Sequence, residues 1–353
     1  MTHRTLKADD EALKVFKQTI AKYPATEEAY SALDGIEQIY VETNNISEYI
    51  AYTKTLSKMK MQAASSEDSL VYVTGELQYM MGNYEQAAAG LTTYITRFCP
   101  DGRYCINAMY YAANSYYQLK QYEEATEQYS ALADIPGNPY LEEACMRVAE
   151  LSYDKQEYRT ALYYFQRMLG VASNAQMHQT ALLGMLRCSY HIKDSINTIK
   201  YASQLLEVEA LDELKRNEAL YCRASAYFTT GEYGLALVDY NILAKEVRTD
   251  WGAEAKYKAA ACYYHLGAVD MAEQEIMSFT RMQTSHQYWL AKSLILLADI
   301  NVDKNDLFQA KQYLLALQNN YRKADDLAAI ISDKLAHIQQ LEIQQNTDTT
   351  IIE

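Results

Sequence analysis

The residues that most often perform catalysis are scattered along this chain of 353 residues. The sequence contains no H-E-x-x-H pair, no nucleophilic serine elbow and no glycine-rich phosphate loop. Its 46 carboxylates are most simply the solvated face of helices, and nothing supports Asp34 or Glu76 as a catalytic acid. We therefore predict no enzymatic activity, no catalytic residue, no metal site and no cofactor. The dispersed histidines are His3, His178, His191, His265, His286 and His337.

The six cysteines form no C-x-x-C pair, and no histidine is close enough to suggest a metal-ligand set. Cys99 and Cys105 flank the loop FCPDGRYC and could form a disulfide in an oxidising compartment, with two free thiols as the ordinary alternative. The other four fall on expected helices, where small thiols usually serve in packing. They are Cys145, Cys188, Cys222 and Cys262.

Composition and charge exclude several functions. The chain has a net charge of −14 and a pI near 5.0, and its basic residues form no stripe, so nucleic acid and anionic membrane surfaces are poor partners. Only 12 Gly and 4 Pro occur beside 33 Tyr, which favours long helices joined by short loops. No apolar run is long enough to insert into a membrane.

A repeat of 36–38 residues organises these helices. It is anchored by a residue that is alanine at seven of nine positions: Ala12, Tyr49, Ala87, Ala125, Ala161, Ile199, Ala236, Ala272 and Ala310. Large residues recur three positions before the anchor and four positions after it, which places them with the anchor on one helical face. This is the second helix of a hairpin, helix B.

Helix A precedes helix B. Twelve residues before most anchors stands a small residue, such as Ala113, Ala149 or Ala224, and nine before several stands a tyrosine, such as Tyr116 or Tyr227. Small residues on both helices let the two backbones approach closely. The first 25 residues contain a helix B without a helix A, which leads us to expect that the chain is the C-terminal part of a longer protein.

These columns resemble the tetratricopeptide repeat, although its tryptophan is replaced here by Val71, Met109, Cys145, Leu183 and Leu220. The resemblance implies an all-α fold, a right-handed α-solenoid of helix-turn-helix hairpins with about eight repeats and a C-terminal capping helix. We place a partial repeat (helix B only) at 1–25, eight hairpins at 26–323, the cap at 324–345 and a frayed tail at 346–353.

One stretch resembles more closely the repeats of bacterial periplasmic TolA-binding proteins and outer-membrane assembly lipoproteins. It carries their Y-x-x-A, aromatic-Pro loop and A-x-Y-x-x-A-x-x-Y-Y pattern at Tyr84, Ala87, Pro100, Gly102, Ala108, Tyr110, Ala113, Tyr116 and Tyr117. The resemblance implies a periplasmic or outer-membrane-associated protein. The polar N-terminus MTHRTLKADD, which has no signal core, leaves the cytoplasm as the alternative.

In this repeat helix A lines the concave surface, and residues 15, 11 and 8 before each anchor share one stripe of it. Aromatic and acidic side chains dominate that stripe, which suits an extended peptide or a basic partner, because tyrosine offers contact area at little cost in rotamer entropy. The stripe has no Lys or Arg, which argues against an acidic C-terminal peptide as the partner. The predicted groove residues are Tyr72, Glu76, Tyr79, Tyr110, Asn114, Tyr117, Glu150, Tyr153, Tyr221, Phe228, Tyr257 and Tyr264.

The sequence thus predicts a non-catalytic scaffold that binds a protein or peptide in a tyrosine-lined acidic groove. Two alternatives stay open. The tyrosines could pack against the neighbouring helix A and only stiffen the solenoid. They could also bind carbohydrate or another small ligand, although the tryptophans that such sites prefer, Trp251 and Trp289, lie off the stripe. On the stripe, the hairpin anchored at Ile199 contributes Gly184, Cys188 and His191.

Overall fold

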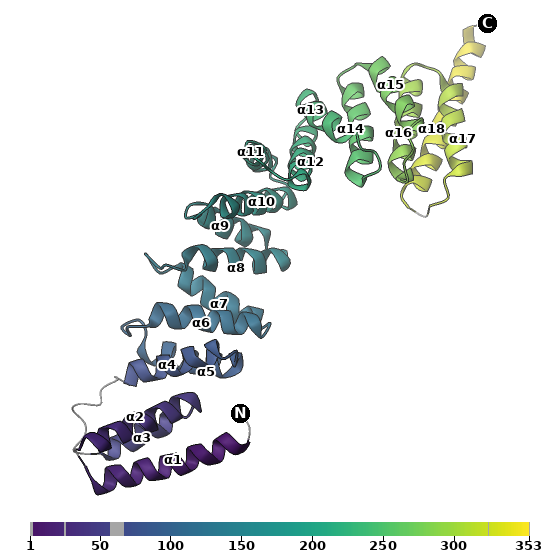
Figure 1. Cartoon of the computed structure of the whole chain (residues 1–353). Helices are drawn as coiled ribbons and strands as arrows, with labels where there is room; N and C mark the ends of the chain where they lie inside the picture. The colour runs from purple at the N-terminus through teal and green to yellow at the C-terminus, as the bar shows by residue number, and fades with distance from the viewer. Residues whose placement is uncertain (1–2, 25, 57–66, 324, 353) are drawn as a thin grey trace. The chain divides into compact units, whose positions relative to one another are not determined.

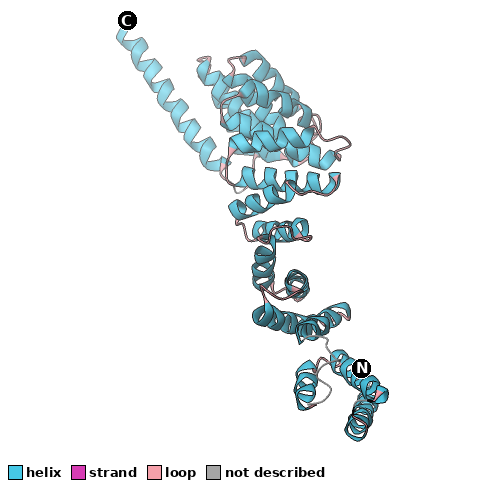
Figure 2. Ribbon diagram, turned by 90° about the vertical axis from the view of Figure 1, so that its left-hand side faces the viewer, coloured by secondary structure: helices cyan, strands magenta, loops and turns pink. Residues whose placement is uncertain are grey.

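The computed structural model describes residues 3–24, 26–56, 67–323 and 325–352, and within these ranges all 18 regular elements are α-helices (Figure 2). Contacts between Cα atoms divide the chain into two compact units, Met1–Met177 (unit 1) and His178–Glu353 (unit 2). Each unit is a stack of antiparallel helical hairpins, so the predicted all-α repeat fold is confirmed.

In unit 1, α1 packs on α2, and the hairpins α2/α3, α4/α5, α6/α7 and α8/α9 follow in chain order (Figure 1). Helix B of one hairpin also packs on helix A of the next, as α5 does on α6 and α7 on α8. The helices are α1 (His3–Lys22), α2 (Glu27–Glu42), α3 (Ile46–Thr55), α4 (Glu67–Met80), α5 (Tyr84–Phe98), α6 (Cys105–Gln118), α7 (Tyr122–Ala133), α8 (Leu141–Asp154) and α9 (Tyr158–Leu169).

Unit 2 continues the pattern with the hairpins α12/α13, α14/α15 and α16/α17, and α18 covers the last hairpin by packing on α17 and α16. Its helices, with α10 lying across the boundary, are α10 (Ala175–His191), α11 (Ser195–Leu206), α12 (Glu213–Thr229), α13 (Tyr233–Leu243), α14 (Asp250–His265), α15 (Val269–Thr280), α16 (Gln287–Asp303), α17 (Leu307–Asn320) and α18 (Leu327–Ile352). No helix in the described ranges is long and apolar enough to cross a membrane.

The capping helix differs from the prediction in its end. We ended the cap at residue 345 and expected a frayed tail from 346, but α18 continues to Ile352; residue 353 lies outside the described residues. The segment NTDTTII contains neither glycine nor proline, so nothing in it terminates a helix.

The turn between helix A and helix B is built identically in eight places. One residue of each turn has a positive φ, between 59° and 81°, and the N–H of the next residue donates to the carbonyl five residues earlier. This is a Schellman ending, which satisfies the last carbonyls of helix A. The positive-φ residues are Asn44, Gly82, Lys120, Gln156, Lys193, Gly231, Gly267 and Asn305.

Each anchor lies five residues after this turn residue, and this spacing corrects one anchor. In α11 the turn residue Lys193 assigns the anchor to Thr198, not to Ile199 as the sequence suggested. Thr198 is 1% exposed, and its hydroxyl donates to the carbonyl oxygen of Asp194 at 2.8 Å. A threonine can fill a small buried column because its hydroxyl finds a partner inside its own helix.

The core of each hairpin lies where helix B meets helix A. The anchor and the residues four and seven positions later are buried in α5, α7, α9, α11, α13, α15 and α17, for example Ala125, Tyr129 and Leu132 of α7. The small residue that lies twelve positions before the anchor lets helix A approach helix B closely. A Cβ at Gly75, one of these positions, would lie 2.7 Å from Cγ of Leu91. Hairpin packing therefore depends on shape as well as on hydrophobicity.

The four cysteines expected on helices are free and buried. Burial raises the pKa of Cys145 to about 11 and the pKa values of Cys188, Cys222 and Cys262 to about 12. These thiols remain protonated at neutral pH and act as packing residues.

Candidate functional site

The predicted stripe runs along helices A, and the structure shows that its aromatic rings are fixed by neighbours. Two kinds of ring contact recur, one for the residue 15 positions before the anchor and one for the residue 8 positions before it. We call the surface formed by these residues the helix A face and describe it separately for each unit.

The rings 15 positions before the anchor stack on an aromatic ring at the start of the next helix A. The two pairs in unit 1 have centroids 4.4 and 3.9 Å apart, and the two pairs in unit 2 have centroids 5.7 and 5.9 Å apart. Such offset stacking adds to the apolar burial between hairpins. The pairs are Tyr72–Tyr104, Tyr110–Tyr140, Tyr221–Trp251 and Tyr257–Trp289.

Both tryptophans lie off the stripe, as expected, but they are direct neighbours of it. The sequence carries a signal that we did not use: an aromatic residue recurs 21 positions before four anchors. This recurring position is not part of the tetratricopeptide motif, and its role becomes clear only from the stacking contacts in the structure.

The hydroxyl groups of three of these tyrosines donate to carboxylates. Tyr110 donates to Oε2 of Glu143 at 2.8 Å and Tyr221 to Oε2 of Glu254 at 3.0 Å, each on the next helix A. Tyr72 donates to Oε1 of Glu76 in its own helix at 2.6 Å. Burial and these carboxylates raise the pKa of all three phenols, which therefore stay neutral donors.

The rings 8 positions before the anchor pack edge to face against the first residue of helix B in the same hairpin. Four such pairs have centroids 5.3–5.7 Å apart, and each lies beside the turn that joins helix A to helix B. They are Tyr79–Tyr84, Tyr117–Tyr122, Tyr153–Tyr158 and Phe228–Tyr233. Tyr264 instead donates its hydroxyl to Asp303, and that hydrogen bond, followed by burial, raises the pKa of Tyr264 to about 12.

Two of the predicted groove residues have almost no surface to offer. Tyr72 is 3% exposed beneath Tyr104, and Asn114 is 7% exposed with its amide donating to the Tyr110 carbonyl of its own helix at 3.0 Å. Asn114 therefore has little surface with which a partner could form contacts. The other ten predicted residues are half-buried, so they combine fixed positions with accessible surface.

The stripe also carries one cation that we did not expect. With Thr198 as the anchor, the stripe of α10 consists of Leu183, Arg187 and Tyr190 rather than Gly184, Cys188 and His191. Nε and Nη2 of Arg187 donate to Glu218 on α12 at 2.6 and 2.8 Å.

Further cations lie beside the stripe. In unit 1 the Arg147 guanidinium lies 4.7 Å from the ring centre of Tyr117 and pairs with Glu150 at 3.2 Å. Burial nevertheless raises the pKa of Glu150. In unit 2 the Lys258 ammonium lies 4.1 Å from the ring centre of Phe228, and Lys292 lies 5.6 Å from Trp289. The face of unit 1 is therefore predominantly acidic, whereas the face of unit 2 presents both charges.

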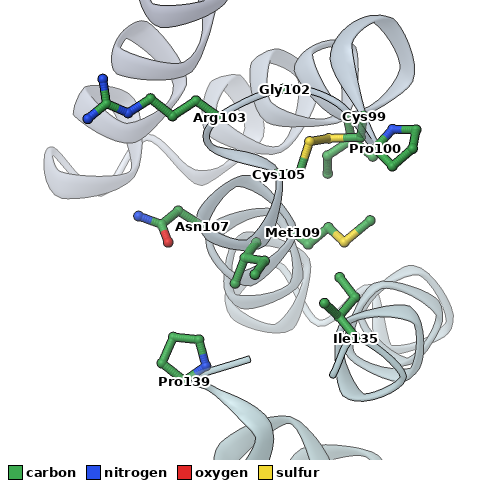
Figure 3. Close-up of a pocket in the computed structure, with 11 residues that line it drawn as sticks. Cys99, Pro100, Gly102, Arg103, Cys105, Asn107, Met109, Ile135 and Pro139 are labelled. Atoms are coloured by element: carbon green, nitrogen blue, oxygen red, sulfur yellow. A yellow bond between two sulfur atoms is a disulfide. The ribbon is translucent and has the colours of Figure 1, made fainter. Parts of the chain in front are cut away.

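A pocket of about 690 Å³ lies in unit 1 between two successive loops that lead from helix B to the next helix A (Figure 3). Its walls are mostly apolar, and Asn107 and Arg103 are its polar members. The apolar walls consist of Ile95, Pro100, Ile106, Met109, Ile135, Pro139 and the cystine. The sequence does not indicate this pocket, because the residues that line it come from two different repeats.

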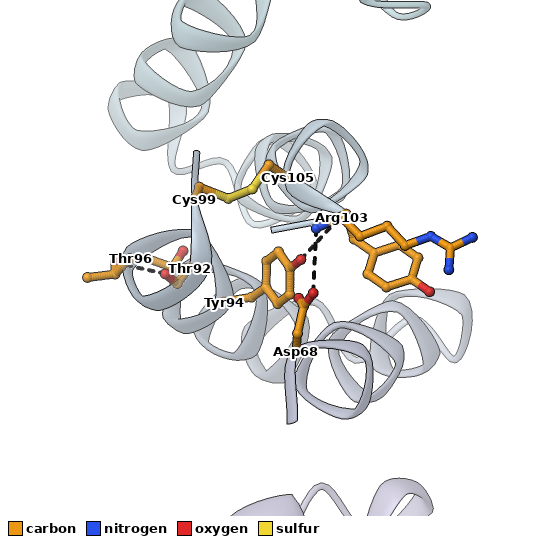
Figure 4. The surroundings of a disulfide bond; sticks show 8 residues. Asp68, Thr92, Tyr94, Thr96, Cys99, Arg103 and Cys105 are labelled. Carbon is orange, nitrogen blue, oxygen red and sulfur yellow. Dashed lines mark hydrogen bonds between the residues drawn. A yellow bond between two sulfur atoms is a disulfide. The ribbon is translucent and has the colours of Figure 1, made fainter. Parts of the chain in front are cut away.

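The pocket loop is closed by a disulfide between Cys99 and Cys105, which resolves the alternative left open by the sequence (Figure 4). Beneath the loop, the Tyr94 hydroxyl accepts a hydrogen bond from the N–H of Tyr104 at 3.0 Å. A Cβ at Gly102 would lie 2.7 Å from that hydroxyl oxygen, so only glycine fits there. Burial and Asp68 raise the pKa of Tyr94 to about 12.

The carboxyl of Glu254 yields a prediction about pH. Burial raises its pKa above the ordinary value near 4.5, although the hydrogen bond from Tyr221 and the charge of Lys258 oppose this. A raised folded-state pKa gives stability that is fully present below pH 4.5 and is lost as pH rises through the folded value. As the pH falls from 7 toward 4.5, the free energy of unfolding of Glu254→Gln should therefore rise less than that of the parent in urea titrations. Equal gains would show that this carboxyl is not perturbed.

Two family models match parts of the chain. The tetratricopeptide repeat model matches residues 107–135, which cover most of α6 and all of α7, and the TT21 fifth ARM repeats domain model matches residues 142–263. Tetratricopeptide repeats generally mediate protein–protein interactions and are non-catalytic.

One curated protein shares a segment of sequence. A stretch of 94 residues is 35% identical to a DnaJ homolog subfamily C member 3 homolog of Dictyostelium discoideum and makes up 26% of this chain. The matched stretch covers only 18% of that protein.

Several solved structures show similar helical repeats. A tetratricopeptide repeat protein of Parabacteroides merdae has a TM-score of 0.37 at 16% identity over 77% of this chain and 98% of its own. The P58(IPK) TPR domain has a TM-score of 0.31 at 14% identity over 97% and 96%. The C-terminal part of a TPR repeat-containing protein of Cytophaga hutchinsonii has a TM-score of 0.36 at 14% identity over 84% and 98%.

Proposed function

We propose that this chain is a non-catalytic scaffold that binds an extended or basic segment of a partner protein on the helix A face of unit 1. The observation that carries the proposal is a row of half-buried rings, Tyr79, Tyr117 and Tyr153, each fixed edge to face against its own helix B. Because these rings are already ordered, a partner that covers them loses little side-chain entropy.

The charge of this face supports a basic or hydrogen-bond-donating partner. Glu76, Glu143 and Glu150 lie among the rings, and the chain as a whole carries a net charge of −14. A basic segment would be attracted to such a surface at a distance, and its affinity should fall as salt rises.

The test replaces two rings on adjacent helices. Partners captured from a cell extract and identified by mass spectrometry would be titrated calorimetrically against the parent chain and the variant Tyr79→Ala/Tyr117→Ala. We expect at least tenfold weaker binding, about 1.4 kcal/mol, because ordered central aromatics carry much of an interface's energy.

The control Glu124→Ala/Glu127→Ala changes two exposed residues of helix B in α7 and should bind as the parent does. Circular dichroism melts of all variants would separate lost binding from lost folding. If the ring variant bound normally while the helix B variant failed, the partner would occupy the opposite face and the proposal would be wrong.

We propose that the chain acts in an oxidising compartment, as a protein of the bacterial cell envelope. The disulfide of the pocket loop supports this, and so does the resemblance to TolA-binding and outer-membrane assembly proteins. Blocking thiols in intact cells before lysis, followed by mass spectrometry, should find Cys99 and Cys105 unmodified and the chain in the envelope fraction. Alkylation of both residues would favour the cytoplasm.

A second candidate, carbohydrate binding, is favoured by one observation in unit 2. The half-buried stacked pairs Tyr221–Trp251 and Tyr257–Trp289 provide the indole rings that sugar sites prefer. A glycan array would distinguish the two functions. Carbohydrate binding should give a signal that Trp289→Ala abolishes, whereas a scaffold for proteins should give no such signal.

A further inference from the structure

Helix α13 of unit 2 is apolar on two opposite faces. One face is buried in the hairpin core through Ala236, Tyr240 and Leu243. The other face exposes three large apolar side chains at helical spacing, Leu235 (49%), Val238 (60%) and Ile242 (46%). A helix that is apolar all round is normally covered on all sides, so this outer face calls for a partner.

The exposed residues are arranged symmetrically along the helix. Leu235 and Ile242 lie at equal sequence distance on either side of a point just after Val238, and so do the exposed residues Glu232 and Lys245 beyond the helix ends. Glu232 is the N-cap of α13, and Lys245 follows its C-cap. Neither side chain has an ion pair with another residue that the structure describes.

We propose that this outer face binds the same face of a second copy of the chain, with the two α13 helices antiparallel about a two-fold axis near Val238. In that arrangement Leu235 of each copy meets Ile242 of the other, and Glu232 meets Lys245 twice, once on each side of the axis. An isologous contact requires such self-complementarity, and the charges oppose a parallel arrangement, in which like charges would meet.

Gly234 supports a close approach. It lies inside α13, and a Cβ built there would touch nothing within 4 Å. A glycine within a helix costs about 0.5–1 kcal/mol relative to alanine, and this fold gives no packing reason for that cost. A second helix lying against the position would supply one.

The contact is small, so the dimer should be weak and concentration-dependent. The helix has 11 residues, and two copies that each carry a net charge of −14 repel each other. Sedimentation velocity over a wide concentration range, at about 0.15 M salt to screen that repulsion, should show a monomer–dimer equilibrium.

Three variants of the full chain test the geometry. Val238→Asp should weaken association at least tenfold, because two carboxylates would meet at the axis, whereas Ile196→Asp, at an 80% exposed position of α11, should not. Glu232→Lys and Lys245→Glu should each weaken it, by about threefold to tenfold, and combining them should restore it, because the ion pairs re-form with exchanged signs. Circular dichroism would check the fold of each variant.

A cysteine at the axis provides an independent readout. Val238→Cys should form a dimer linked by that residue under mild oxidation, since the four free thiols of the parent are buried. A chain that stays monomeric at the highest concentration would overturn the proposal. Three other results would also overturn it: association that tolerates Val238→Asp, a charge exchange that does not restore association, and the absence of the crosslink. Each of these three would assign the face to a different partner or orientation.

Discussion

Replacing Arg223 with methionine is expected to lower the free energy of unfolding of unit 2 by about 2–3 kcal/mol. Nε and Nη2 of Arg223, on α12, donate to both carboxylate oxygens of Asp239 on α13 at 2.8 Å, and Nη1 donates to Ser203 on α11 at 3.1 Å. The Asp239 side chain is 2% exposed and that of Arg223 is 22% exposed. Methionine would leave a buried carboxylate without its counterion, and the partial exposure of Arg223 moderates the loss.

Urea titration followed by circular dichroism would measure this effect. Asp239→Asn should cost less than Arg223→Met, because the amide oxygen still accepts from the guanidinium. The combined change Arg223→Met/Asp239→Leu should also cost less than Arg223→Met alone, since no buried charge remains. If the double variant were as unstable as the sum of its single changes, the pair would not act as a unit.

The anchor column gives the second large effect. Ala125 and Ala161 are both 0% exposed, so a leucine at either position must displace the facing helix. We expect Ala125→Leu and Ala161→Leu each to cost about 1–3 kcal/mol in unit 1. Glu124→Leu places the same side chain one position away on an exposed surface and should change stability by no more than about 0.5 kcal/mol. Unchanged melting of both anchor variants would contradict the buried column.

The fold was predictable because it depends on short-range patterns. An anchor, a small residue twelve positions earlier and bulky residues on each side are enough to assign both helices of a hairpin. The register failed at α11 for a physical reason: Thr198 and Ile199 compete for the anchor, and hydrophobicity alone favours Ile199. The left-handed backbone of the turn residue Lys193 assigns the anchor to Thr198. In five of the eight turns the left-handed residue is not glycine, so no single residue type marks the turn in the sequence.

The candidate site was predictable only in part. Spacing identified which rings share the helix A face, but their partners come from neighbouring hairpins, as the stacking of Tyr110 on Tyr140 shows. Because such contacts join residues about one repeat apart, single-helix periodicity does not reveal them. The same holds for Asn114, whose amide turns back to its own helix.

The stacking of Trp251 and Trp289 on tyrosines has a practical consequence. These are the two indoles of the chain, both belong to unit 2, and each reports on a contact between successive hairpins. Fluorescence excited selectively at the indole would therefore be silent about unit 1 and would change when the C-terminal hairpins separate. Comparing that signal with the helical content of the whole chain would show, without any label, whether the two units melt together or one after the other.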